Sequence, residues 1–507
     1  METTTRIPPN LSHQHLMGEE HQNPLGGQPK RITPVERVVT LREWLTVLVL
    51  CFVNLINYMD RFTIAGILTD IQKNYNIGDD LGGLLQTAFI VSYMIFAPLF
   101  GYLGDRYNRK FIMSFGVFLW CLTTFIGSYM QSFEWFLVFR MFVGIGEASY
   151  STIAPTIISD LFVKDVRSKM LALFYFAIPV GSGLGYITGS KTAEFAGSWH
   201  WGLRVTPVLG ILAVFLILLV VQDPVRGERE GGSHIHSTSW TDDIKSLCRN
   251  PSFMLSTAGF TCVSFVAGAL AWWGPSFIHL ALTLQPNGGK EITLSDVSYK
   301  FGIIAMIAGI IGVPLGSIMA QRLRVKWRNA DPLICAVGLL ISTPFLFFGI
   351  ITASTNSILC YTLIFFGQLA LNLNWSIVAD MLLYVVLPTR RSTAEAFQIL
   401  IAHMLGDAGS PYIIGLVSQA LKKALSPTTL VIGDEDKNEY DAVTKFRSLQ
   451  YALFITTFIE IIGGLFFFFT ALYIQKDKAV VDLSIADETV SETLQYYDDE
   501  LPNSTTN

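Results

Sequence analysis

The chain has 507 residues, of which 51% are hydrophobic and only 15% are charged, with a formal net charge of -5. A typical soluble protein is about 25% charged, so this composition excludes a water-soluble globular protein and indicates that most residues do not face water. The six cysteines show none of the spacings of a zinc or redox motif. We therefore expect no disulfide and no zinc site. No other metal and no cofactor is expected.

Apolar stretches of about 20 residues, the length that a helix needs to cross a bilayer, recur along the whole chain. They predict an all-α polytopic membrane protein with twelve transmembrane helices, at residues 44–68, 84–103, 111–130, 135–160, 168–190, 203–222, 252–284, 298–320, 331–352, 357–383, 393–421 and 448–474. The flanking segments, 1–42 and 476–507, are polar, and we expect them to be disordered tails.

A polar link at 223–251 divides the helices into an N-terminal six-helix bundle, 43–222, and a C-terminal six-helix bundle, 252–475. Within the link, Trp240 to Cys248 is a candidate for a short interfacial helix. Two sets of six helices suggest two repeats related by an axis along the membrane normal, with a ligand site near the midplane between them.

Basic residues gather in the loops on one side of these helices, for example at 106–110 and 322–328. Loops rich in lysine and arginine stay in the cytosol, so we expect both termini and the 223–251 link there. The loop at 422–447, on the other side, mixes basic and acidic residues and weakens this bias without reversing it.

Two charged neighbours, Asp60 and Arg61, stand inside the first apolar span. Each such residue costs roughly 2.5–3.5 kcal/mol at the centre of a bilayer even on the mildest scales. The pair therefore indicates either a watery cavity in which the charges act or a lock between two helices.

The fourth span carries a second pair, Arg140 and Glu147. Seven residues turn a helix by about 700°, so the two share a face. The first and fourth spans run in opposite directions, and all four charges can meet in one pocket of the first half. The proton affinity of a buried acid depends on its neighbours, so helix movements that change the pairing would bind and release a proton. The alternative is a static salt bridge between helices.

Residues 101–110, between the second and third spans, combine glycines, an acid and a basic cluster: Gly101, Gly104, Asp105, Arg106 and Arg109. Glycine allows a tight turn and close approach of helices, and the basic cluster suits the inner membrane surface. The segment resembles the G-x-L-x-D-R-x-x-R-K loop of the major facilitator superfamily, which in that family latches the two halves on the cytosolic side. Residues 316–324 of the second half have no acid where Asp105 stands, so the latch is expected to be one-sided.

The spans of the second half hold fewer charges. His403 and Asp407 are one helical turn apart and can pair, which makes His403 a candidate for a proton or substrate role, beside the alternative of a packed, hydrogen-bonded histidine. The polar candidates for a cavity wall are Tyr58, Asn372, Asn374 and Asp407. Glu460, in the last span, shows no evident partner, and its role stays open.

Three segments together resemble the Spinster family of the major facilitator superfamily: N-Y-M-D-R-F at 57–62, G-Y-L-G-D-R-Y-N-R-K at 101–110 and R-M-F-V-G-I-G-E-A-S-Y at 140–150. The resemblance extends over all twelve spans and is strongest in the first half. It implies a proton-coupled carrier of lysophospholipids or of sphingoid lipids such as sphingosine 1-phosphate, in late endosomes and lysosomes or at the plasma membrane. Asp60, Arg61, Arg140 and Glu147 would then be the coupling and headgroup residues.

Three functions remain open, because a fold alone does not decide function. They are a lipid carrier, a carrier of a small water-soluble organic anion or sugar in the same fold, and a non-transporting lipid sensor. A sensor does not need paired buried charges on separate helices, which favours a carrier. We expect alternating access without enzymatic activity, a functional monomer, no nucleic-acid partner, and a late endosomal or lysosomal membrane before the plasma membrane.

Overall fold

The computed structural model describes residues 39–162, 164–224, 240–285, 292–387, 390–425 and 434–500. The chain forms two compact units, Met1–Thr40 and Leu41–Asn507, and the helices belong to the second. Nearly all of the expected tail at 1–42 and much of the 223–251 link lie outside the described residues.

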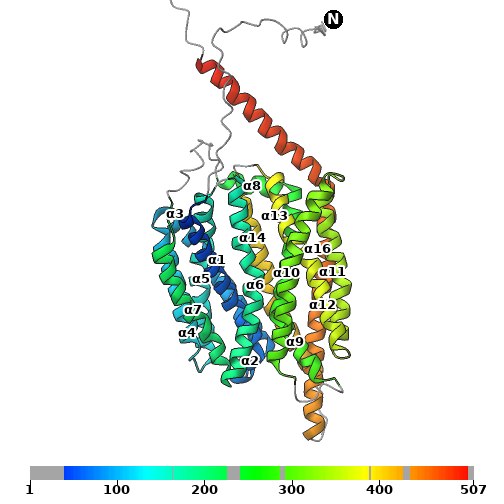
Figure 1. The fold of residues 1–507 in the computed structure, drawn as a ribbon. Coiled ribbons are helices and arrows are strands. Elements are labelled where there is room, and N and C mark those ends of the chain that lie inside the picture. The colour runs from blue at the N-terminus through cyan, green and yellow to red at the C-terminus, as the bar shows by residue number, and fades with distance from the viewer. Residues whose placement is uncertain are drawn as a thin grey trace, which may run out of the picture. The chain divides into compact units, whose positions relative to one another are not determined.

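The helices follow the predicted order (Figure 1). The first half contains α1 (Leu41–Gly66), α2 (Leu68–Tyr75), α3 (Asp79–Arg106), α4 (Arg109–Gly127), α5 (Phe133–Leu161), α6 (Lys164–Ala196) and α7 (Trp199–Val220). Helix α8 (Trp240–Arg249) forms in the link where a short helix was expected. The second half contains α9 (Pro251–Thr283), α10 (Leu294–Arg324), α11 (Ala330–Thr352), α12 (Ser357–Asn372), α13 (Asn374–Val385), α14 (Arg391–Ile401), the π-helix η2 (Ala402–Asp407), α15 (Gly409–Leu425) and α16 (Asp434–Glu500).

Eleven helical segments of the described chain are long and apolar enough to cross a membrane. The remaining span is α5, whose 29 residues include Arg140 and Glu147, charges that lower its average hydropathy. The predicted all-α fold with twelve transmembrane helices is thereby confirmed. Two spans are interrupted: α12 and α13 meet at Leu373, and α14 continues through η2 into α15.

The last helix corrects the expected C-terminal tail. Helix α16 runs from Asp434 to Glu500, so residues 476–500, which were expected to be disordered, are helical. Asp477 fixes the start of this extension, because its Oδ2 accepts a hydrogen bond from the backbone N–H of Ser252 (3.0 Å). Continuing an existing helix avoids the unfavourable nucleation step, so a polar sequence can prolong a helix that it would not start.

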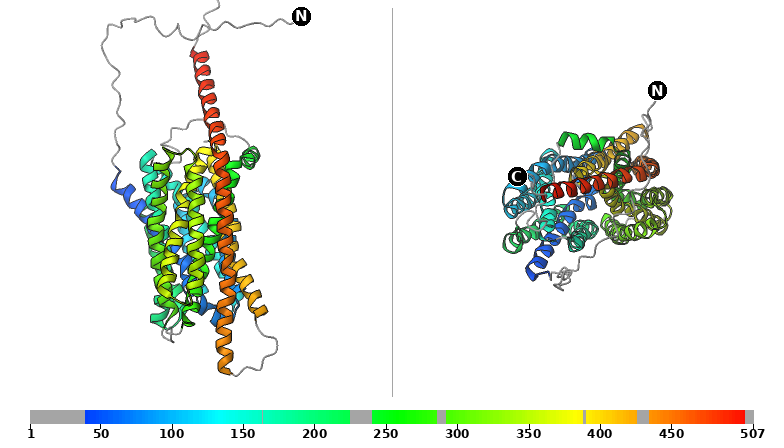
Figure 2. Two further views of the ribbon diagram at one scale, coloured as in Figure 1. Left: turned by 90° about the vertical axis from the view of Figure 1, so that its right-hand side faces the viewer. Right: turned by 90° about the horizontal axis from the view of Figure 1, so that it is seen from above.

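The most extensive contacts between the two halves are those of α6 with α10 and of α3 with α15. Figure 2 shows the blue-to-cyan helices of the first half beside the green-to-orange helices of the second. Their backbones approach closely at glycines, since a Cβ on Gly183 would lie 2.7 Å from the carbonyl oxygen of Gly302 and a Cβ on Gly302 equally close to that of Gly183. Such glycines let helices pack at short range and set the distance between the halves.

The end of the bundle that carries α2 is called the far end here (Figure 1). At this end, side-chain hydrogen bonds join the two halves. Trp272 Nε1 donates to Gly82 O (3.1 Å), and Ser298 Oγ donates to Gly66 O (3.0 Å). Lys191 Nζ of the first half also lies 2.9 Å from Asp296 Oδ1 of the second half. The interface between the two halves is called the seam below. The opposite end, which carries the α3–α4 connection at residues 107–108, is called the latch end.

Gly83 offers a test of this close packing. A Cβ at Gly83 would lie 2.2 Å from the carbonyl oxygen of Pro411 in α15, whereas a Cβ at Gly101 of the same helix would meet nothing within 4 Å. We expect Gly83→Ala to lower the stability of the purified protein by about 1–3 kcal/mol through overpacking, and Gly101→Ala to be neutral or slightly stabilising. Thermal unfolding in detergent compares the two, and equal stabilities would show that α3 and α15 separate without penalty.

Candidate functional site

Four buried charges lie together between α1 and α5. Arg61 Nη2 is 3.3 Å from Glu147 Oε2, and Arg140 Nη1 is 3.8 Å from Asp60 Oδ2. Each helix contributes one acid and one base. The pairs are crossed, because the base of α1 pairs with the acid of α5 and the acid of α1 pairs with the base of α5. All four residues are less than a tenth exposed. The four charges thus meet within the first half, as the sequence predicted.

Asp60 is also held from two further helices. Thr124 of α4 donates a hydrogen bond to Asp60 Oδ2 (3.3 Å), and Thr206 of α7 donates one to Oδ1. A threonine hydroxyl can donate to a carboxylate or accept from a protonated acid. The surroundings of Asp60 can therefore satisfy both of its protonation states.

Aromatic rings enclose the two guanidinium groups. Arg61 Cζ lies 5.1, 4.9 and 5.6 Å from the ring centres of Tyr58, Phe89 and Tyr93, and Arg140 Cζ lies 4.3 Å from that of Phe89. Cation–π contacts contribute about 2 kcal/mol or more when the cation is desolvated. The rings therefore offset part of the hydration that both arginines lose.

The two pairs leave hydrogen-bonding capacity unused. Within the described part of the chain, Glu147 Oε1, Arg61 Nε and the Nε and Nη2 atoms of Arg140 are buried and have no hydrogen-bond partner. Buried polar groups in proteins are nearly always paired. The cluster can therefore take on a further partner, either a proton or an anionic group of a ligand, without first breaking every existing contact.

The second half contributes a histidine–aspartate pair. His403 Nδ1 lies 2.8 Å from Asp407 Oδ1, as their spacing predicted, and both residues belong to the π-helix η2. The His403 ring makes an edge contact with Tyr93 across the seam, with 6.3 Å between ring centres. The two side chains are 31% and 22% exposed, so this pair is accessible, unlike the four charges of the first half. π-Helical turns are frequent at functional sites.

Asn372 and Asn374 are not brought to the charged cluster. They flank Leu373 at the break between α12 and α13, and their amides donate to Gln368 O (2.8 Å) and Leu371 O (2.9 Å). These contacts satisfy backbone carbonyls next to the break, which gives the two residues a local structural role in this arrangement.

Glu460 has a partner that the sequence did not reveal. Ser342 of α11 donates a hydrogen bond to its Oε1 (2.7 Å), and the side chain is fully buried in the second half. Glu460 therefore belongs to the packing of α16 against α11, and its functional role stays open.

Comparison with known proteins now decides the family. The model of the Major Facilitator Superfamily matches residues 50–411. Protein spinster of Drosophila melanogaster is 56% identical over 523 aligned residues, which cover 96% of this chain and 86% of the relative. Human protein spinster homolog 1 is 51% identical over 454 residues, which cover 88% and 83% of the two chains. The chain belongs to the Spinster family.

A solved structure agrees with this family assignment. A bacterial homolog of the human lysosomal transporter Spinster, in an inward-facing and unoccupied conformation, matches with a TM-score of 0.74 at 21% identity, covering 86% of this chain and 98% of that one. The match confirms the superfamily fold. As a member of the Spinster family, the protein is a multi-pass membrane transporter and not an enzyme.

The latch segment of this Spinster-family chain differs in part from expectation. Helix α3 continues to Arg106, so the two glycines lie within the helix and only residues 107–108 form the turn. Gly104 does permit close approach, since a Cβ there would lie 2.9 Å from Ile153 Cγ1 of α5, but Gly101 has open space around it. Arg106 stacks over the Tyr102 ring at 3.7 Å, and the side chain of Asp105 lies outside the described residues.

Arg109 makes three side-chain contacts within the described part of the chain. Its Nε lies 2.7 Å from Asp223 Oδ1, its Nη1 2.5 Å from Asp160 Oδ2, and its Nη2 2.6 Å from Pro224 O. These partners all belong to the first half or to the chain directly after it. In this structure Arg109 therefore fastens α4 to the end of α5 and to the segment that follows α7.

The second half has an ion-pair cluster of its own at the latch end, although residues 316–324 contain no acid. Arg324 lies 2.7 Å from Asp331 and 2.9 Å from Asp380, and the Tyr384 hydroxyl donates to Asp331 (2.7 Å). Asp331 stands seven residues after Arg324, at the start of α11, and not at the position that corresponds to Asp105.

Sequence reasoning missed the supporting residues of the site. Thr124, Thr206, Phe89 and Tyr93 all contact the four charges. Threonine and aromatic residues are common in any transmembrane helix, and these four come from three different helices. Nothing in the sequence marks them, because only the packing of α3, α4 and α7 around α1 brings them together.

The Arg61–Glu147 pair predicts unequal stabilities for single and double variants. Glu147→Ala leaves Arg61 buried without its acid, which we expect to destabilise the protein by roughly 3–5 kcal/mol. Combining Arg61→Met with Glu147→Met removes the unpaired charge and should recover most of that loss. Thermal unfolding in detergent gives the measurement. A double variant no more stable than Glu147→Ala would show that the two residues do not form an energetic unit.

Proposed function

We propose that this Spinster-family transporter carries single-chain lipids, namely lysophospholipids, sphingosine or sphingosine 1-phosphate, by proton-coupled alternating access. The observation that supports it best is the crossed pairing of Asp60 with Arg140 and of Arg61 with Glu147 inside the first half. Apart from the His403–Asp407 pair, the spans of the second half offer mainly apolar residues, which suit the acyl chain of a lipid.

Arg61 is the proposed headgroup residue. It faces Tyr93, which in turn contacts His403 of the second half, so it lies nearest to the seam. A guanidinium binds phosphate through two parallel charge-assisted hydrogen bonds. The partly exposed Asp407 supplies a carboxylate on the opposite wall that suits the ammonium group of the same headgroup.

Glu147 is the proposed coupling residue. While it is ionised, it occupies the guanidinium of Arg61. A proton on Glu147 removes that charge, so Arg61 becomes free to bind the phosphate. Proton and lipid would then bind together and cross the membrane in the same direction. Asp60 and Arg140 hold α1 to α5 behind this pair and form a second titratable unit.

The proposed topology places both termini and the latch end in the cytosol, as the basic loops indicate. The proposed location is the late endosomal or lysosomal membrane, with the plasma membrane as second candidate. It is supported by the description of human Spinster as a lysosomal transporter. We propose that the monomer is the working unit, since the two halves of one chain supply the whole site.

The first transport prediction concerns coupling. We expect Glu147→Gln to abolish lysolipid uptake driven by a pH gradient into proteoliposomes while it still binds the lipid, because the amide mimics the protonated acid. Asp60→Asn should also lose gradient-driven uptake. The matched control is Glu134→Gln, an exposed glutamate in the first turn of the same helix α5, which should transport normally.

Normal gradient-driven transport by both Glu147→Gln and Asp60→Asn would show that these charges form only a static salt bridge between helices. Loss of activity in the Glu134→Gln control would point instead to a general effect of substitutions in α5.

The second transport prediction concerns the lipid tail. Burial of each methylene contributes about 0.8 kcal/mol, so the affinity of competing lysolipids should rise by up to roughly fourfold per added carbon. Competition for uptake by a series of lysolipids with one headgroup and increasing chain length measures it. Competition by sugars or short carboxylates, with no effect of any lysolipid, would reassign the protein as a carrier of water-soluble solutes.

A further inference from the structure

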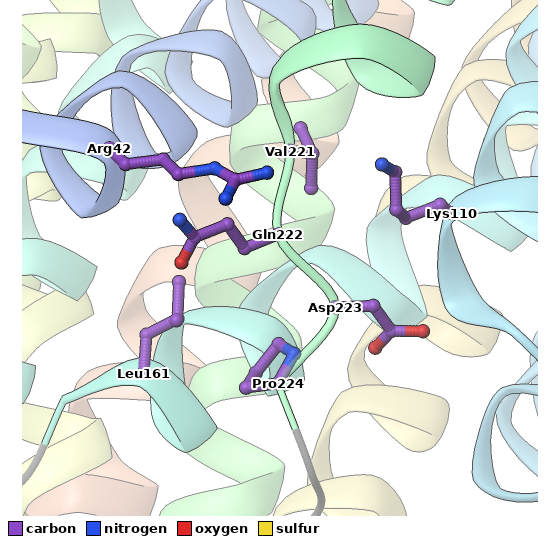
Figure 3. Close-up of a pocket in the computed structure, with 7 residues that line it drawn as sticks. All are labelled: Arg42, Lys110, Leu161, Val221, Gln222, Asp223 and Pro224. Carbon is purple, nitrogen blue, oxygen red and sulfur yellow. The ribbon is translucent and has the colours of Figure 1, made fainter.

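A charged pocket lies at the latch end, far from the four buried charges. It has a volume of about 420 Å³ and is lined by Arg42, Lys110, Leu161, Val221, Gln222, Asp223 and Pro224 (Figure 3). Arg42 precedes Asp60 by 18 residues on α1, which corresponds to about 27 Å along the helix. The pocket is therefore separate from the proposed transport site.

The pocket is built on residues 221–224, the segment that follows α7, and hydrogen bonds hold this segment from two sides. The backbone N–H of Gln222 donates to Thr46 Oγ1 of α1 (3.2 Å). The backbone N–H of Arg109, the first residue of α4, donates to Asp223 Oδ2 (3.1 Å). In Figure 3 the side chains of Arg42 and Lys110 flank this segment. Its position thus depends on α1 and α4 together, and a ligand that contacts both helices would brace it.

The charges of the pocket do not cancel. Asp223 accepts hydrogen bonds at both of its oxygens from Arg109, which also pairs with Asp160. Arg42 and Lys110, in contrast, have no side-chain hydrogen-bond or ion-pair partner among the described residues. Among the described residues that line the pocket, Arg42 and Lys110 carry positive charges without such a partner, and the one acid, Asp223, is already bound to Arg109.

This combination suits a phosphate group. A guanidinium and an ammonium donate charge-assisted hydrogen bonds to phosphate oxygens, the Gln222 amide can add another, and Leu161 and Val221 give the pocket an apolar side. Basic pockets between helices at the cytosolic surface of a membrane are suited to anionic lipid headgroups. We propose that this pocket binds the phosphate of an anionic membrane lipid in the leaflet at the latch end.

A binding experiment on the purified full-length protein tests this site without any transport step. The probe is a short-chain phosphatidylinositol phosphate, and the readout is the rise of the unfolding midpoint with probe concentration, because a ligand that binds only the folded state stabilises it. We expect a rise for the wild type and a loss of apparent affinity of roughly tenfold or more when Arg42→Gln and Lys110→Gln are combined. The charge-conserving double variant, Arg42→Lys with Lys110→Arg, should retain binding.

The matched control combines Arg322→Gln with Lys326→Gln, which removes the same two charges from exposed positions at the latch end of the second half. This control should respond to the probe as the wild type does. A second arm uses the soluble inositol phosphate headgroup alone. A response to the lipid only supports a membrane headgroup, and an equal response to the soluble compound supports a phosphate site filled from solution.

An undiminished response in Arg42→Gln/Lys110→Gln would overturn the proposal, as would an equal loss in the control variant, since binding would then follow net charge or use another site such as Arg61. Because binding is measured in the absence of a lipid gradient, failure here leaves the proposed transport function untouched.

Discussion

The desolvation of charge is the constraint on which the rest of this structure depends. Each charged side chain near the centre of a bilayer costs roughly 2.5–3.5 kcal/mol on the mildest scales, and α1 and α5 carry four of them. Crossed pairing, the hydroxyls of Thr124 and Thr206, and the rings around the guanidinium groups each offset part of that cost. These partners come from α1, α3, α4, α5 and α7, so the contacts that make the charges tolerable also hold the first half together.

The two halves of the molecule differ in what they can contribute to transport. The first half concentrates charge in one buried cluster. The second half packs against the first through close backbone contacts at Gly183 and Gly302 and through side-chain hydrogen bonds at the far end. A seam of glycines and single hydrogen bonds can be broken one contact at a time. This arrangement is suited to a rocking motion of one half against the other around a fixed charged site.

The sequence predicts the fold well because membrane thickness dictates helix length, and it predicts the meeting of Asp60, Arg61, Arg140 and Glu147 because helical periodicity places Arg140 and Glu147 on one face. It fails where the outcome depends on packing or on helix continuation. Helix α16 continues past residue 476 into a polar sequence that would not start a helix, Gly101 lies inside α3, and the amides of Asn372 and Asn374 are taken up by carbonyls of their own span. The type and order of residues alone do not show where a helix ends or which neighbour takes up a polar side chain.

The central claim is that a proton on Glu147 and a phosphate on Arg61 bind together. Proton exchange on lipid binding tests it most directly: a lysolipid is added to the purified protein in weakly buffered solution near neutral pH, and the pH is followed with an indicator dye. The account predicts that the wild-type protein takes up protons as the lipid binds, and that Glu147→Gln binds the lipid without taking up protons. Lipid binding to the wild type without any pH change, or the same uptake in Glu147→Gln, would contradict it.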